Sequence, residues 1–336
     1  MQLSIIIPVY NVEACIEKCI RSLEDQDIPH NEFEIIIVND GSTDNGRKVV
    51  LRLMREFDNI VFIEQENKGV SIARNNAIDI ARGEYLLPVD PDDYILPKTL
   101  KRVLERVDME GLDVLYLGFG ILNEYGKPGW HADYKVQEKN IYSGVDGYFA
   151  ARGKAIRNPD RSVGIFYRKV LLEQHTIQYP QNVPYLEDGI FLAKVFSVAL
   201  KVSFDHLAFY QRTTTRVGSA TNSNLIYSEN AINGFLHTID NLNQFQKSQN
   251  LTNEGTLLLN HVKAKFLILP LSVCIACRNK KKYKNLIDRL RQMGYKKINL
   301  DGLRLGYKRL ARVYNFNPFL FYYFFPFNQK INQLLQ

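Results

Sequence analysis

The chain has few cysteines, and their pattern gives no disulfide framework. Four cysteines occur in 336 residues, too few for a disulfide-dense scaffold. Cys15 and Cys19 are spaced i, i+4 in an apolar stripe, as on the buried face of a helix. Cys274 and Cys277 have the spacing of a redox motif, but they lie in an apolar run, and the sequence offers no second pair for zinc. We therefore expect all four to be core residues.

Long apolar runs are also missing. No run reaches the roughly 18 residues of a membrane-spanning helix, and the longest candidates, Phe266–Cys277 and Phe316–Phe327, are interrupted by proline. The first residues carry no basic leader and run directly into the apolar segment Leu3–Val9. We therefore expect a cytoplasmic protein without a signal peptide or a membrane span.

Two glycine-rich phosphate loops are absent. The sequence has no Gly-x-x-x-x-Gly-Lys-Ser/Thr loop, and no Gly-x-Gly-x-x-Gly follows the first apolar segment. The first absence excludes P-loop nucleotide hydrolases. The second argues against a dinucleotide-binding Rossmann site, and the glycine-rich N-terminal loop of sugar-phosphate nucleotidyltransferases is missing as well. A phosphorylated ligand would therefore need a metal ion held by acidic side chains, helped by a basic side chain.

The excess of positive charge is confined to one segment. The chain carries a net charge of +7 and is 46% hydrophobic, enough to bury a sizeable core. Residues 278–312 contain 13 Lys and Arg against two Asp, which leaves the remainder with a net charge of −4. The aromatic segment Phe316–Phe327 follows. This combination suits an anionic bilayer surface, here the inner face of the cell membrane. The alternative is a solvated basic face with an aromatic helix packed on the body. We expect no nucleic-acid partner, because no nucleic-acid-binding motif accompanies the basic segment.

Strand-like and helical patterns alternate over the first 120 residues or so. The alternation predicts an α/β fold with a doubly wound, mostly parallel, Rossmann-like sheet. Asn11 is expected to cap the first helix, and Pro97 to open the fourth. The predicted strands are Leu3–Val9, Phe33–Val38, Ile60–Glu64, Glu84–Val89 and Asp113–Phe119.

The pattern changes after Gly120. Helices are predicted at 143–152 and 188–199, and strands at 162–167 and 204–212. From Asn222 onward the pattern is helical, with a break at Pro270. We predict three parts, namely residues 1–120, residues 121–221 of the same domain, and a helical C-terminal extension over residues 222–336.

Polar side chains follow three of the predicted strands. Tyr10 comes after the first strand, Asp40 after the second, and Asp90, Asp92 and Asp93 after the fourth. The carboxyl ends of parallel strands meet at one edge of a sheet, so one site is expected there. Oxygen-rich clusters suit hard divalent cations, which bridge to phosphate oxygens. The alternative for the acids is a solvated turn.

Three side chains of this site have two interpretations each. The ring of Tyr10 either stacks on a base or is an ordinary half-buried aromatic. Asp40 either accepts a hydrogen bond from a ring N–H, such as the uracil imide, or holds an Asx-turn or helix cap before Gly41. Arg74 is either the basic group near the phosphates or a solvated residue on a helix surface.

Five stretches stand in order along the chain, namely Ser4–Asn11, Ile37–Asp44, Asn67–Asn75, Ala81–Tyr85 and Asp90–Asp93. Together they resemble the family 2 glycosyltransferases, inverting nucleotide-sugar enzymes with a GT-A type fold. A second tier, Tyr185–Phe191 and Tyr210–Ser219, extends the resemblance from about residues 3–120 to about residue 220.

The resemblance implies a role for each matching position. Residues 1–120 would bind the nucleotide-sugar, and residues 121–221 the acceptor. Asp90 would contact ribose or a metal-bound water, Asp92 would bind manganese or magnesium at the diphosphate, and Asp93 is a second candidate ligand. Pro91 departs from the family, which more often has a small residue such as Ser there. The remaining positions are Pro8, Tyr10 and Asp40 for the uridine, Arg74 near the nucleotide, and Asp188 as the general base.

Asp188 lies in the pair Glu187-Asp188, whose alternative role is to favour a helix N-terminus. The family's processive synthases carry membrane spans and a Gln-x-x-Arg-Trp motif, whereas the one Trp here is Trp130. The expected activity is therefore single-sugar transfer from a UDP-sugar to a saccharide or lipid-linked acceptor in capsule, exopolysaccharide or other cell-surface glycan assembly. The alternative is a non-catalytic nucleotide-sugar-binding or scaffolding subunit. The loop Gln211–Ser219 is expected to close over the diphosphate through Arg212 or Arg216, or else to be plainly solvated.

Overall fold

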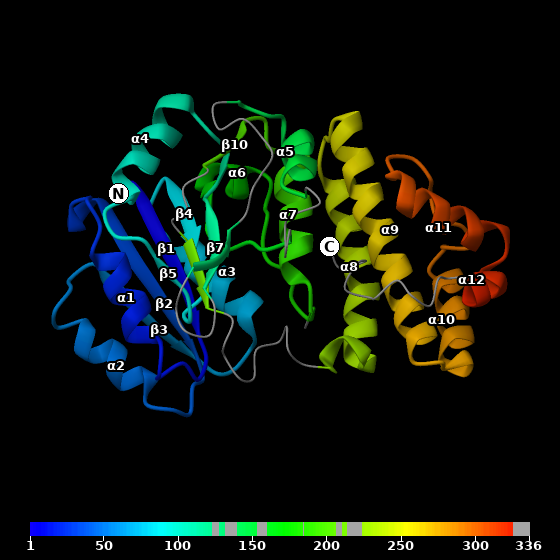
Figure 1. Cartoon of the computed structure of the whole chain (residues 1–336), viewed down its shortest axis with the longest axis horizontal. Coiled ribbons are helices and arrows are strands. Elements are labelled where there is room, and N and C mark those ends of the chain that lie inside the picture. The colour runs from blue at the N-terminus through cyan, green and yellow to red at the C-terminus, as the bar shows by residue number, and fades with distance from the viewer. Residues whose placement is uncertain are drawn as a thin grey trace. The chain divides into compact units, whose positions relative to one another are not determined.

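The computed structural model describes most of the chain as two compact units (Figure 1). The described residues are 1–122, 128–131, 140–152, 160–183, 185–205, 210–213 and 224–324. The first unit comprises Met1–Arg157, Arg161–Gln181 and Ala199–Val217. The second comprises Asn158–Asp160, Asn182–Val198 and Gly218–Gln336. The division into residues 1–120, 121–221 and 222–336, with a separate role for each, stays a prediction.

The first unit is built on a seven-stranded sheet in the order β10-β6-β9-β4-β1-β2-β3. β9 runs antiparallel to both neighbours, whereas the other pairings are parallel. The central strands are buried along their length, as in sheets covered on both faces. The predicted mostly parallel α/β sheet is confirmed. Its strands are β1 Leu3–Val9, β2 Phe33–Asp40, β3 Ile60–Gln65, β4 Tyr85–Pro88, β6 Val114–Tyr116, β9 Ile165–Arg168 and β10 Val202–Phe204.

Helices connect these strands. The chain moves from β1 through β2 to β3, and then returns to β4 on the far side of β1. Because such crossovers are right-handed, the return connection α3 must lie on the sheet face opposite α1 and α2. Each of α1, α2 and α4 buries one apolar stripe. The helices are α1 Ile16–Glu24, α2 Gly46–Leu53, α3 Val70–Ile80, α4 Leu100–Glu110, α5 Gly144–Ala150 and α6 Lys169–Gln174, with a 3₁₀ turn η1 at His30–Glu32.

A second, four-stranded sheet in this unit corrects two strand predictions. It has the order β5-β11-β7-β8, from β5 Tyr94–Ile95, β11 Tyr210–Thr213, β7 Phe119–Leu122 and β8 Pro128–His131. The predicted strand Asp113–Phe119 spans the end of one sheet and the start of the other, and so does the predicted strand 204–212. The sequence pattern does not mark where the chain leaves one sheet for the other, so each predicted strand combined residues of both sheets.

Two predicted helix starts are wrong. Asn11 does not cap α1, which begins after Cys15 without a side-chain cap. Its carboxamide instead accepts a hydrogen bond from the backbone N–H of Thr43 at 2.8 Å. Helix α4 begins at Leu100, three residues beyond Pro97. Local signals locate helices better than they locate the first residue.

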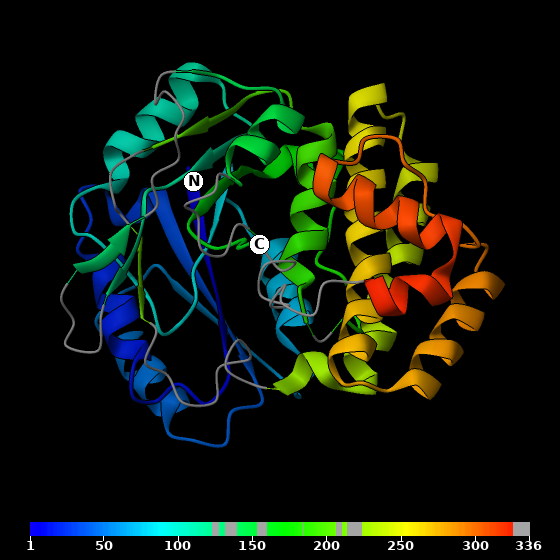
Figure 2. The ribbon, with the colours of Figure 1, turned by 45° about the vertical axis from the view of Figure 1, so that its right-hand side comes forward.

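The second unit is helical and centres on α9. This helix packs against α7, α8, α10 and α11. Both views place α7 (green) and α8 along α9 (Figures 1 and 2). Side chains of Ser228, Thr252 and Asn279 cap α8, α9 and α10, each accepting a backbone N–H three residues ahead. The elements are α7 Glu187–Val198, η3 Asn224–Tyr227, α8 Glu229–Ser248, α9 Asn253–Ala276, α10 Lys280–Gln292, α11 Leu305–Phe316 and α12 Pro318–Phe324.

Pro270 does not break α9, contrary to the prediction. The proline lies inside the 24-residue helix and is buried. It removes one backbone hydrogen bond, but packing on four other helices holds the rest of α9 together. Among the described residues α9 alone is long and apolar enough to cross a membrane, and 89% of its most apolar window is buried inside the protein. A core helix passes the same test of length and composition.

A buried ion pair ties α9 to Asp160 within this unit. The ammonium of Lys265 bonds the carboxylate of Asp160, and both residues are less than 10% exposed. The carboxylate also lies against Gly189 in the first turn of α7, where an added Cβ would meet an Asp160 oxygen at 3.3 Å. The pair therefore joins α9 to the start of α7.

Removing one partner should cost much more than removing both charges. Lys265→Met leaves a buried carboxylate unpaired, and we expect the free energy of unfolding to fall by about 3–5 kcal/mol. The double variant Asp160→Asn/Lys265→Met should be more stable than Lys265→Met. Urea denaturation followed by circular dichroism measures both. As a control, Lys169→Met breaks a more exposed ion pair with Glu173, and should cost less than about 1 kcal/mol. Equal losses for Lys265→Met and the double variant would contradict the coupling.

Candidate functional site

The three acids lie on a tight turn between β4 and β5. The backbone N–H of Asp93 donates to the carbonyl of Asp90 at 3.0 Å, which closes a four-residue turn. Pro91 occupies the second position, where its fixed φ is favourable. The turn bond uses the N–H of Asp93, so the N–H that Pro91 lacks is not needed to close it. Pro91 therefore fits the turn although it departs from the family.

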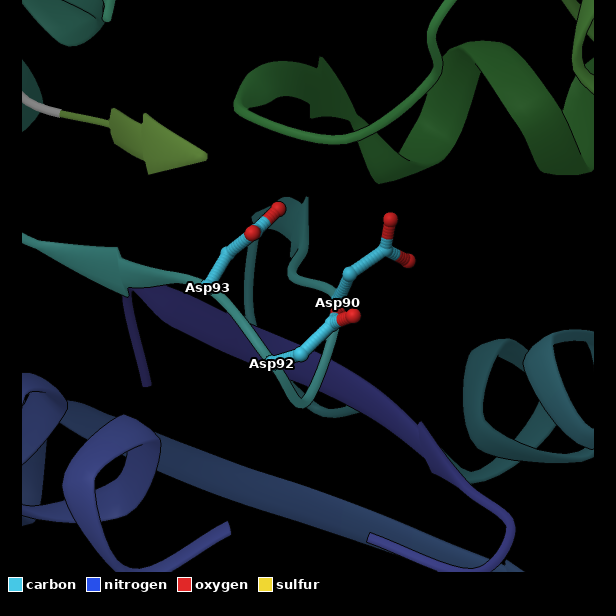
Figure 3. A group of neighbouring side chains, drawn as sticks. All are labelled: Asp90, Asp92 and Asp93. Carbon is cyan, nitrogen blue, oxygen red and sulfur yellow. The ribbon is translucent and has the colours of Figure 1, made fainter. Parts of the chain in front are cut away.

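The three carboxylates converge. Each of Asp90, Asp92 and Asp93 offers an oxygen within 4.8 Å of the oxygens offered by the other two. Figure 3 shows the three side chains on this one turn. Asp90 and Asp92 are half-buried, whereas Asp93 is buried. An all-oxygen donor set of this size fits magnesium or manganese, which accept carboxylate ligands together with water and phosphate.

Asp93 is held by the second sheet. The hydroxyl of Tyr210 donates to one carboxylate oxygen at 2.7 Å, and the backbone N–H of Thr213 donates to the other at 2.7 Å. The same tyrosine hydroxyl accepts the backbone N–H of Asp90 at 3.1 Å. Burial, together with the neighbouring Asp90 and Asp92, holds the pKa of the Asp93 carboxyl well above its usual range. Asp93 therefore fixes the turn to β11 with both of its oxygens.

Arg74 is not the solvated surface residue of the alternative interpretation. It is 4% exposed, and its guanidinium donates to the Asp90 carboxylate at 3.1 Å. The guanidinium also lies over the ring of Tyr179, with 5.0 Å to the ring centroid. Burial raises the pKa of the Asp90 carboxyl, and the charge of Arg74 opposes that rise. Helix α3 thus delivers a buried positive charge to the acidic turn.

Asp40 fixes a neighbouring loop instead of capping the helix after its own strand. One carboxylate oxygen accepts the backbone N–H of Lys68 at 2.7 Å and the side-chain amide of Gln65 at 2.7 Å. The other oxygen accepts the N–H of Gly69 at 2.9 Å. The turn after Asp40 passes close to this loop, because a Cβ on Gly41, whose φ is +73°, would meet the backbone of Asn67 at 2.9 Å. Asp40 therefore does not form the helix cap or Asx-turn before Gly41 that its alternative interpretation gave it.

The loops after β1 and β2 are tied together. Tyr10 comes two residues after Pro8, which is buried in β1, and Tyr10 is 46% exposed. Asn11 has a φ of +51°, a conformation that Asn tolerates. The backbone N–H of Glu13 donates to the carboxylate of Asp44 at 2.8 Å. This bond and the one between Asn11 and Thr43 join the loop that carries Tyr10 to the loop that follows Asp40.

Asp188 belongs to the second unit. It lies half-buried in the first turn of α7, next to Glu187. The helix begins after Leu186, whose φ of +65° is unusual for a branched side chain. Gly189 in the same turn contacts Asp160, the partner of Lys265. Of the predicted lid, Arg212 lies half-buried in β11, whereas Arg216 falls outside the described residues.

Sequence reasoning missed the role of Tyr210. The residue stands in the second-tier motif, but no function was assigned to it. Its signal was a tyrosine inside an apolar strand, since a buried tyrosine hydroxyl needs a partner. Tyr179, beneath Arg74, carried no signal that sets it apart from other aromatic core residues.

Replacing Tyr210 with Phe tests its link to the acidic turn. The change leaves the Asp90 N–H and the Asp93 carboxylate short of one partner, so we expect a loss of stability of about 1–3 kcal/mol and weaker binding of Mn²⁺. Tyr85→Phe is the matched control, because its hydroxyl donates to the carbonyl of Val107 at 3.0 Å, away from the acids. Tyr85→Phe should lower stability without weakening the binding of Mn²⁺. Thermal unfolding and titration calorimetry with Mn²⁺ distinguish the two variants. Unchanged Mn²⁺ affinity in Tyr210→Phe would contradict the link.

Comparisons with known proteins agree with this fold. The chain is 32% identical to a poly(ribitol-phosphate) beta-glucosyltransferase of Bacillus spizizenii over 205 residues, which are 60% of this chain and 31% of that protein. The crystal structure of Staphylococcus aureus TarS 1-349 in complex with UDP-GlcNAc superposes with a TM-score of 0.71 at 22% identity, covering 96% of this chain and 89% of that one.

A more distant solved structure is the mannosyltransferase PcManGT from Pyrobaculum calidifontis in complex with GDP-Man and Mn²⁺. It has a TM-score of 0.55 at 15% identity and covers 99% of this chain and 85% of that one. The fold is therefore of the GT-A type. The chain spans about one third of the length of curated relatives that it matches, such as the glucosyltransferase above. Residues 4–170 match the sequence model described as glycosyl transferase family 2, and the chain belongs to this family.

Proposed function

We propose that this chain is an inverting glycosyltransferase that moves a sugar from a UDP-sugar to a hydroxyl of a saccharide or lipid-linked acceptor. The observation that carries the proposal is the acidic turn Asp90–Asp93, whose carboxylates converge beside the buried guanidinium of Arg74. The family supports glycosyl transfer. A relative that glucosylates poly(ribitol-phosphate) and a neighbour bound to UDP-GlcNAc support cell-surface glycan assembly and a uridine donor.

The uridine is assigned to the edge formed by β1 and β2. The exposed ring of Tyr10, next to buried Pro8, offers a face on which a base stacks. Asp40 already accepts three hydrogen bonds, two on one oxygen and one on the other. A carboxylate has about four lone-pair sites, so its less occupied oxygen has capacity for one more donor, which fits the imide N–H of uracil.

The diphosphate is assigned to the acidic turn together with a divalent ion, manganese or magnesium. Asp92 and Asp90 are the proposed metal-facing acids, and Asp93 is the second candidate because both of its oxygens serve β11. When bound, the ion neutralises charge that builds on the departing diphosphate. Arg74 orients Asp90 and adds a fixed positive charge that costs no reorganisation during the reaction.

Asp188 is the proposed general base. An acceptor hydroxyl is a poor nucleophile near neutral pH, so a carboxylate within hydrogen-bond reach must remove its proton as the new C–O bond forms. One displacement at the sugar carbon, with the diphosphate leaving from the opposite face, inverts the configuration. The first turn of α7 is held by Gly189 against Asp160, which gives the base a fixed position within its own unit.

Asp92→Ala should abolish metal-dependent donor binding. The variant removes one carboxylate of the cluster, and we expect UDP affinity in the presence of Mn²⁺ to fall to the level measured without metal, because the ion joins the acids to the diphosphate. Calorimetry with and without Mn²⁺ measures this difference. Asp58→Ala, which removes an exposed carboxylate elsewhere in the unit, should keep the full response to metal. A normal Mn²⁺ response in Asp92→Ala refutes the metal role.

Asp188→Asn should separate binding from turnover. The amide keeps the shape of the side chain but cannot accept the proton, so UDP affinity should stay unchanged while transfer falls by about 10²–10⁴. Once a UDP-sugar panel scored for donor hydrolysis with Mn²⁺ identifies the donor, single-turnover assays measure the transfer. Glu187→Gln, one residue earlier, is the matched control and should keep most activity. Full turnover by Asp188→Asn would remove it as the base, and UDP binding without any hydrolysis or transfer by the unaltered chain would indicate a non-catalytic subunit.

A further inference from the structure

The helices α10 to α12 combine a large excess of positive charge with an uncharged aromatic end. Residues 278–312 contain 13 basic residues, with Asp288 and Asp301 as the acidic residues of the same segment. No charged residue occurs from Val313 to Phe327. The basic side chains are mostly exposed along α10 and α11, so their charge faces solvent.

Helix α12 is apolar on all sides, yet half of it is exposed. Phe321 and Tyr322 face inward and are 0% and 7% exposed. Phe319 and Tyr323 lie on the other side and are 44% and 62% exposed, and Phe316 just ahead of the helix is 83% exposed. A helix that is apolar all round is normally buried on all sides. Among the residues that the structure describes, the outer side of α12 therefore has no apolar neighbour of the kind its composition requires.

The exposed aromatic side chains are flanked by cations. Lys280, in the first turn of α10, lies 5.2 Å from the ring centroid of Tyr323, and Arg291, near the end of α10, lies 5.9 Å from that of Phe319. The hydroxyl of Tyr283 donates to the carbonyl of Pro318 at 2.6 Å, which fixes α12 against α10. We call the exposed side chains of α10 and α12, together with Phe316, the basic-aromatic face.

We propose that the basic-aromatic face docks on an anionic lipid bilayer. Lys and Arg on α10 meet the headgroups, and Phe316, Phe319 and Tyr323 enter the interfacial layer, where aromatic rings are favoured. The contact goes beyond the proposed transfer reaction, because it involves neither donor nor acceptor. It would keep the enzyme at the inner face of the cell membrane, where a lipid-linked acceptor is presented.

Two other partners for the basic-aromatic face would account for only part of these observations. A soluble polyanion would neutralise the cations but leave the three aromatic rings in water. A second copy of the chain would bury the rings but bring two segments of net charge +11 together, which repel each other. A bilayer with anionic lipids meets both requirements.

Vesicle sedimentation with the full chain tests the proposal. We expect binding to vesicles that contain anionic phosphatidylglycerol at low salt, and weak binding to neutral phosphatidylcholine or at high salt, where surface charges are screened. Lys280→Gln/Lys281→Gln/Lys284→Gln should lower the partition coefficient by about 100-fold, since each cation contributes about fivefold. Phe316→Ser/Tyr323→Ser should lower it by roughly tenfold through lost apolar burial. Arg55→Gln/Lys98→Gln/Lys101→Gln removes three exposed cations from the first unit, and should change binding by less than about twofold.

Four results would overturn the proposal. The first is no sedimentation with anionic vesicles at low salt. The second is equal weakening by the control triple variant, which would mean non-specific attraction. The third is binding to soluble polyphosphate as tight as to vesicles and insensitive to Phe316→Ser/Tyr323→Ser. The fourth is a stable dimer in light scattering that this double variant dissociates. Circular dichroism and the unfolding midpoint confirm that each variant remains folded, and all the substituted side chains are exposed.

Discussion

The site depends on the parallel pairing of β1 with β2 and with β4. In this register Ile6 is opposite Pro88, and Pro8 is opposite Val38. Continuing this register by two residues makes Tyr10 level with Asp40, and Asp90, the first residue of the acidic turn, level with Pro8. Parallel strands require long connections, so residues that are far apart in the sequence leave the sheet at one edge. The pairing of three strands thus brings the exposed Tyr10, the carboxylate of Asp40 and the acidic turn to one edge of the sheet.

The acidic turn needs more than the sheet edge. Three carboxylates within 4.8 Å repel one another, and a free turn would splay them apart. The structure prevents this with a strand of the second sheet. Tyr210 both donates to Asp93 and accepts from the backbone of Asp90, so one hydroxyl closes the turn from outside. β11 is therefore part of the site, although Tyr210 comes 120 residues after Asp90 in the chain.

The sequence allowed the central sheet and the residues of its edge to be predicted, because buried parallel strands are continuous apolar runs and the polar residues follow them directly. The sequence did not predict features that depend on contacts between distant segments of the chain. Asp40 bonds the loop at Lys68 and not its own turn, a choice set by the distance between two strand ends. Pro270 lies within α9 because surrounding helices outweigh its local effect. The burial of Arg74 against Tyr179 depends equally on tertiary packing.

Charge balance separates the two unusual surfaces of this protein. At the acidic turn the compensation is internal, since Arg74 pairs with Asp90 and two hydrogen-bond donors of β11 meet Asp93. Asp90 and Asp92 would hold a divalent cation there, and it would supply positive charge for the proposed diphosphate site. The segment 278–312 has no comparable internal balance, because two acids face 13 bases. Lys282 pairs with Glu229 of α8, and the excess that remains is balanced by solvent ions or by an external anionic partner. The exposed aromatic rings beside it favour the partner, because mobile ions would leave them in water.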